Sequence, residues 1–159
     1  MRHLSNASLL ARIFETVPYA TFLVDLDVHV LHANAMAARL LGLVDQAAGA
    51  MPRRMCDLLR CDNGGREPGG RGSWRECDSC IIRGSVRRAL RGDPVRRVLA
   101  FVEREEHGHQ REICLQVSAA AIEHERRKLA VVTLDDVTDV YHLRSLIPLC
   151  SSCDRIRSA

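Results

Sequence analysis

Apolar and polar residues alternate along residues 111–121, which read REICLQVSAAA. The apolar positions of one face are Ile113, Leu115, Val117 and Ala119. A period of two predicts a β-strand with one buried face, and no other segment constrains the fold as strongly. Two further strand-like runs, 95–103 and 128–134, lie on either side, and short polar connections separate the three. The second half of the chain is therefore predicted to form an antiparallel meander.

The first half is predicted to contribute two more strands. An amphipathic helix spans residues 5–17 and ends before Pro18, which cannot continue it. Two β-rich runs, 20–25 and 28–33, then flank a tight turn and indicate a hairpin. Asn34 follows the hairpin and is a suitable N-cap for a short helix.

A longer helix is predicted from residue 78 or 79 to about residue 91, and an outgoing helix from about Asp136. Strands at both ends with helices between them predict an α+β domain. We expect a five-stranded antiparallel sheet with helices on one face and a flanking helix at each end.

Residues 49–77 do not fit this regular pattern. They read GAMPRRMCDLLRCDNGGREPGGRGSWREC, with six glycines and two prolines, and predict a loop with at most a turn or two of helix near Cys56. A loop of this length inside a compact domain is usually either disordered or held by something.

The seven cysteines are Cys56, Cys61, Cys77, Cys80, Cys114, Cys150 and Cys153. Cys77 and Cys80 are spaced so that both sulfurs can reach one metal ion. They also stand at a predicted helix start, where backbone N–H groups favour the thiolate. Cys56 and Cys61 can arrive from the glycine-rich loop and complete a four-thiol site.

Three interpretations of these four cysteines remain open: a zinc or iron–sulfur centre, a reversible dithiol switch, or inert buried thiols. We expect Cys114, alone on its strand, to be buried as a small apolar side chain. Cys150 and Cys153 are secondary metal candidates. Because 69 residues separate them from Cys80, they indicate either a site shared between two chains or an exposed tail.

The segment ETVPYATFLVDLDVHVLHANAMAARLLG and the exit VVTLDDVTDVYHLR, with Asp136 and Thr138 two apart, resemble the PAS sensor domain over residues 8–145. The resemblance implies a PAS-like domain at 18–136 with its insert at 49–77. A flanking helix at 1–17 precedes the domain, and an outgoing helix with a cysteine tail follows at 137–159. It further implies a sensory or interaction module without catalytic activity or an output domain of its own.

The middle of the chain resembles a cysteine-bearing subgroup of bacterial PAS domains, found ahead of histidine kinases and diguanylate cyclases. Cys61, Cys77 and Cys80 match the subgroup pattern, but Arg71 stands where a Gly-Cys-Gly turn has its cysteine. Cys56 is the alternative fourth ligand; without it the site is incomplete. The resemblance implies redox or oxygen sensing, with a dimerising module that holds structural zinc or no cofactor as the alternative.

Several other functions are not expected. His107, His109 and His124 lie in polar turns, and no histidine lies on the long helix predicted after Cys80, so we do not expect haem. A net charge of +3 with six aromatic residues argues against a nucleic-acid surface. We find neither a signal peptide nor a membrane span, and expect a cytoplasmic protein. We expect a homodimer formed through the flanking helices and a histidine kinase or another signalling protein as partner.

Overall fold

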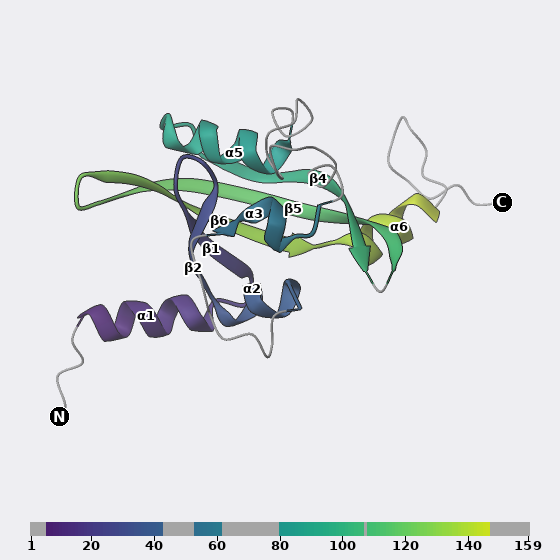
Figure 1. Ribbon diagram of the computed structural model, residues 1–159, viewed down its shortest axis with the longest axis horizontal. Coiled ribbons are helices and arrows are strands. Elements are labelled where there is room, and N and C mark those ends of the chain that lie inside the picture. The colour runs from purple at the N-terminus through teal and green to yellow at the C-terminus, as the bar shows by residue number, and fades with distance from the viewer. Residues whose placement is uncertain (1–5, 43–52, 62–79, 107, 147–159) are drawn as a thin grey trace.

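The computed structural model describes residues 6–42, 53–61, 80–106 and 108–146. The helices are α1 (Asn6–Thr16), α2 (Ala35–Leu40), α3 (Met55–Leu58), α5 (Ile81–Leu90) and α6 (Thr138–Leu146). The strands are β1 (Ala20–Val24), β2 (His29–Ala33), β3 (Arg53–Arg54), β4 (Val95–Glu106), β5 (His109–His124) and β6 (Arg127–Asp136). Figure 1 shows the three long strands β4, β5 and β6 crossing the domain with α5 beside them.

The strands form one antiparallel sheet in the order β3-β2-β1-β6-β5-β4. The predicted meander is confirmed, since β5 pairs with β4 on one side and β6 on the other. The β1–β2 hairpin is joined to this meander by the pairing of β1 with β6, in which Phe22 lies opposite Val132. The two halves of the chain therefore meet in the middle of a continuous sheet.

The sheet has six strands rather than the five predicted from the sequence. The additional strand is β3, whose two residues pair with β2, Arg54 opposite His29 and Arg53 opposite Val30. Two residues carry no measurable alternation, so no sequence pattern predicts them. Its pairing covers part of the outer edge of β2, whose backbone groups would otherwise be unpaired there.

The core lies between one face of the sheet and α5. Phe22, Ile113, Leu115 and Val132 are fully buried on the sheet side. Helix α5 lies across β4, β5 and β6 and buries Ile82, Val86, Ala89 and Leu90 against them. These four residues form the core-facing side of α5.

The two flanking helices lie outside this core. In Figure 1, α1 stands apart from the sheet and touches the domain near α2. Its apolar residues Leu10 and Ile13 are 65% and 51% exposed. Tyr141 of α6 packs edge-on against Phe101, with ring centroids 5.0 Å apart, on the sheet face opposite α5.

Asn34 connects α1, β1 and α2, and the predicted cap is confirmed. Its Oδ1 accepts hydrogen bonds from the backbone N–H groups of Ala37 at 2.9 Å and Thr21 at 3.0 Å. Its Nδ2 donates to the carbonyl oxygens of Phe14, Val17 and Tyr19. The side chain is only 1% exposed, so all these backbone groups depend on one buried amide.

A second polar link fixes the start of α6. The hydroxyl of Thr138 accepts a hydrogen bond from the backbone N–H of Cys114 at 2.9 Å and donates to Asp136. The backbone N–H of Val137 donates to the carbonyl oxygen of Cys114, also at 2.9 Å. The outgoing helix is therefore attached to the middle of β5.

Replacing Asn34 by alanine is expected to lower the free energy of unfolding by about 2–4 kcal/mol, because it removes a helix cap and leaves buried backbone groups unpaired. Urea unfolding followed by circular dichroism measures the change. Glu15→Ala is the control, since it removes one exposed hydrogen bond to the Ala35 N–H and should cost less than about 1 kcal/mol. Equal losses in the two variants would contradict the role assigned to the amide.

Candidate functional site

A small pocket beside the β1–β2 turn is lined by several cysteine and arginine side chains. Its volume is about 70 Å³. The residues that line it, called the cysteine pocket below, are Asp27, Val28, Arg54, Met55, Cys56, Leu59, Cys61, Cys80, Ile82 and Arg83. They come from the β1–β2 turn, from β3 with α3, and from the start of α5.

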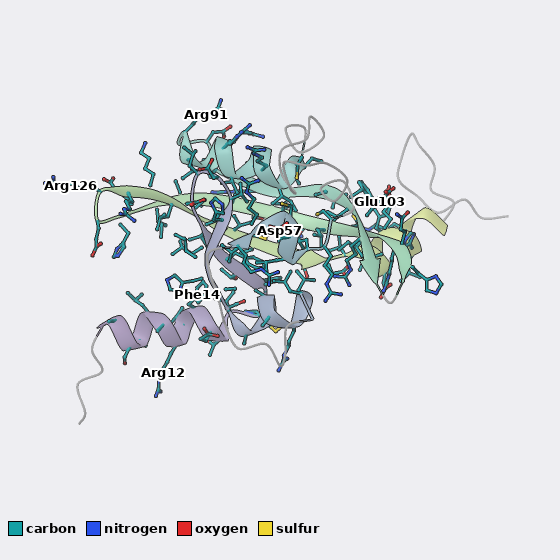
Figure 2. All side chains as sticks on the ribbon, viewed as in Figure 1. Arg12, Phe14, Asp57, Arg91, Glu103 and Arg126 are labelled. Atoms are coloured by element: carbon teal, nitrogen blue, oxygen red, sulfur yellow. The ribbon has the colours of Figure 1, made fainter. Side chains whose placement is uncertain are left out.

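Helix α3 is held against the β1–β2 turn. The backbone N–H of Met55 donates to the carbonyl oxygen of Val28 at 3.1 Å, directly after the β3 pairing. Met55 and Leu59 are buried and anchor the helix to the core. Figure 2 shows α3, with Asp57 labelled, in front of the sheet. This anchoring places the following cysteines beside α5.

Cys56 and Cys61 lie at opposite ends of this helical turn. The chain reverses at Arg60, whose φ of 52° is left-handed. The backbone N–H of Cys61 then donates to the carbonyl oxygen of Cys56 at 3.0 Å. Cys61 also forms an isolated antiparallel bridge with Arg104 of β4. The backbone thus fixes both cysteines at one end of the sheet.

Cys80 occupies the N-cap position of α5. Its backbone is extended, with φ −60° and ψ 123°, and its side chain makes no capping hydrogen bond. The helix that follows is packed firmly on the sheet through Ile82 and Val86. The Cys80 thiol therefore sits at the positive end of a rigid helix.

Three of the four predicted metal ligands, Cys56, Cys61 and Cys80, thus line one pocket. Cys77, Cys150 and Cys153 lie outside the described residues. Within the described part of the chain, no three His, Cys, Asp or Glu side chains are arranged to hold a metal ion. A three-thiol site without a contribution from another segment is therefore not formed.

Cys114 lies apart from the pocket, on the β5 side opposite α5, and is 2% exposed. Burial raises the pKa of its thiol, and the nearby charges of Asp136 and Glu112 raise it further. The protonated thiol is a poor nucleophile and a poor metal ligand. The expectation that Cys114 is a buried side chain is confirmed.

The sequence did not reveal the charged and strained neighbours of the cysteines. Asp25 organises the β1–β2 turn, because its Oδ1 accepts from the N–H groups of Asp27 and His29. Val28 closes the turn with φ 63°, a left-handed conformation that β-branched residues rarely adopt. The Asp-x-Asp spacing was the available signal for this turn. Arg54 of β3 completes the pocket wall.

A family model of the PAS domain matches residues 8–78, which cover α1 to the end of the glycine-rich insert. Residues 8–78 are therefore similar to the PAS domain. PAS domains are sensory modules of signalling proteins and are generally not catalytic. The match includes Asn34 and the segment of Cys56 and Cys61 but does not test the cysteine-bearing subgroup.

Solved structures share the PAS fold at low sequence identity. An RNA-binding light-oxygen-voltage receptor is 20% identical with a TM-score of 0.56, over 92% of this chain and 40% of its own. The VqmA dimer of Vibrio cholerae, solved without its target DNA, is 16% identical with a TM-score of 0.55, over 87% of this chain and 53% of its own. This chain therefore spans about half the length of these neighbours or less. No curated protein is similar enough in sequence to match it.

None of the helices in the described ranges is long and apolar enough to cross a bilayer.

The two kinds of cysteine are expected to differ in reactivity. In reduced, chelator-treated protein at pH 8, iodoacetamide should alkylate Cys80 well before Cys114, because Cys114 is buried and its raised pKa keeps it protonated. Peptide mass spectrometry over a time course measures both rates. Cys114 should react at the rate of Cys80 only after denaturation. Equal rates in the folded protein would contradict the assigned environments.

Proposed function

We propose that this PAS domain senses redox state or oxygen through a metal or iron–sulfur centre held by Cys56, Cys61, Cys77 and Cys80. The observation that carries the proposal is the meeting of Cys56, Cys61 and Cys80 in one pocket, although they come from two separate segments. Cys114, the other cysteine in the described ranges, lies elsewhere.

The donor set suits this centre. Cysteine sulfurs bind zinc and the irons of iron–sulfur clusters, and Arg54 and Arg83 lie on the wall of the same pocket. Cys77 is three positions before Cys80, so the chain keeps their Cα atoms within about 11 Å. It is the natural fourth ligand. A volume of about 70 Å³ matches a metal ion or small cluster and is far below a haem site.

Such a centre would supply a group that changes oxidation state or is lost when oxygen attacks its sulfurs. The protein's own part is to hold the thiols and to respond when they move. Ligation would also offset the conformational entropy that the glycine-rich insert loses when it becomes ordered. The sensing state is then one in which the insert is fastened to the sheet.

The described contacts suggest a route for the signal. Cys61 bridges Arg104 of β4, and a guanidinium nitrogen of Arg104 donates to the carbonyl oxygen of Leu40 at 3.3 Å. β4 pairs with β5, where Cys114 is bonded to Thr138 and Val137 at the start of α6. We infer that release of the insert shifts β4 and β5 and thereby reorients α6.

The flanking helices favour a dimer as the signalling unit. Leu9, Leu10 and Ile13 of α1 are exposed, as are Val140 and Leu143 of α6. Apolar stripes of this kind are stabilised when they pack against a second copy. The proposed partner in the cytoplasm is a histidine kinase or another signalling protein that reads the position of these helices.

The centre is tested by metal analysis and absorption spectroscopy of protein purified without oxygen. We expect bound iron with a brown colour or bound zinc, and a loss of most of the metal in Cys80→Ser. Cys114→Ser is the matched control, because it changes a cysteine remote from the pocket, and should retain the metal.

The outcomes separate the alternatives. Zinc that stays bound under oxygen supports the dimerising module with a structural metal. A metal-free protein that forms a Cys56–Cys61 or Cys77–Cys80 disulfide indicates a dithiol switch. Metal content unchanged in Cys80→Ser would end the four-thiol proposal.

The dimer is tested by Leu10→Glu combined with Ile13→Glu. These changes place charges on the exposed apolar side of α1 and should shift the protein from dimer to monomer in light scattering after size-exclusion chromatography. Arg12→Gln is the control on the same helix and should leave the dimer intact. A double variant that remains dimeric would show that α1 does not form the interface.

A further inference from the structure

A second and larger depression lies at the other end of α5. The β1–β2 turn, the last turn of α5 and the start of β6 enclose a volume of about 750 Å³, called the basic groove below. Its basic residues are Arg87, Arg91, Arg127 and Lys128. Figure 2 shows Arg91 at the end of α5 and Arg126 at the tip of the neighbouring β5–β6 hairpin, on the same side of the domain.

Positive charge dominates this groove. Arg91, Arg127 and Lys128 are exposed, and none forms an ion pair with an acidic residue of the described segments. Of the two acidic residues on the wall, Asp25 is occupied by hydrogen bonds that hold the β1–β2 turn. The groove therefore presents cations that are available to an external anionic group.

The remaining lining of the groove is apolar. It consists of leucines. Leu26, at the tip of the β1–β2 turn between two aspartates, is 61% exposed. Leu90 and Leu129 are buried beneath it. An exposed leucine above buried leucines, surrounded by cations, is complementary to a ligand that carries both apolar and acidic side chains.

We propose that the basic groove binds an acidic, amphipathic peptide segment of a partner protein. A phosphate group alone is less well served, because it has no apolar part to cover the leucines that line the groove. Guanidinium groups pair with carboxylates in a forked geometry, while the leucines accept the apolar side chains of the same peptide.

The test is selection of a phage-displayed library of random 12-residue peptides on the immobilised full chain. Selected peptides should be enriched in Asp and Glu together with Leu, Ile or Phe. Fluorescence anisotropy of one selected peptide should show a Kd that rises at least about tenfold in the Arg91→Glu, Arg127→Glu variant, since two charge pairs become repulsive. Added salt should also weaken binding.

Controls keep the result interpretable. Arg12→Glu reverses an exposed charge on α1, far from the groove in Figure 2, and should leave the Kd within about twofold. Circular dichroism checks that the double variant is folded, and Lys128→Ala replaces it if it is not, with a Kd that should then rise about threefold to tenfold.

Three results would overturn the proposal. The first is selection of peptides without an acidic excess, and the second is equal binding to the folded groove variants. The third is binding of inorganic triphosphate or a 20-nucleotide single-stranded RNA through the same arginines with no peptide selected, which would assign the groove to polyanions.

Discussion

The buried amide of Asn34 is the interaction on which the first part of the domain depends. It terminates α1, orients the start of β1 and caps α2, because its oxygen and nitrogen bond backbone groups from all three segments. Only a side chain with both a donor and an acceptor at one end can do this. The place of β1 in the sheet, and hence of the turn beside the cysteine pocket, follows from this one residue.

The cysteine pocket is also formed by a small number of contacts. A two-residue strand and one backbone hydrogen bond to Val28 are enough to bring Cys56 and Cys61 beside the start of α5. The glycine-rich insert needs no hydrophobic core of its own if thiols fasten it at this point. Cys80 is held in place by its position at the start of α5, which packs on the sheet.

The sequence predicted elements whose physical signal is local. Alternation identified β5, and side-chain chemistry identified Asn34 as a cap and the Asp136-x-Thr138 exit. It did not predict β3, because two residues have no period, or the left-handed Val28, because β-branched residues normally avoid that conformation. The basic groove was also missed, since its walls come from three distant segments. The sequence singled out Cys56, Cys61, Cys77 and Cys80 as metal candidates, whereas the common pocket of Cys56, Cys61 and Cys80 required the fold.

The position of β4 at the end of the sheet order has a consequence for solubility. Within the described ranges, Cys61 alone pairs with the outer edge of this twelve-residue strand, and an unpaired strand edge is a template for another extended chain. The bridge between Cys61 and Arg104 covers this edge of β4 at one point. Phe101, on the same strand, is exposed. Loss of this contact would leave the β4 edge open to strand addition by another chain, which is a route to aggregation.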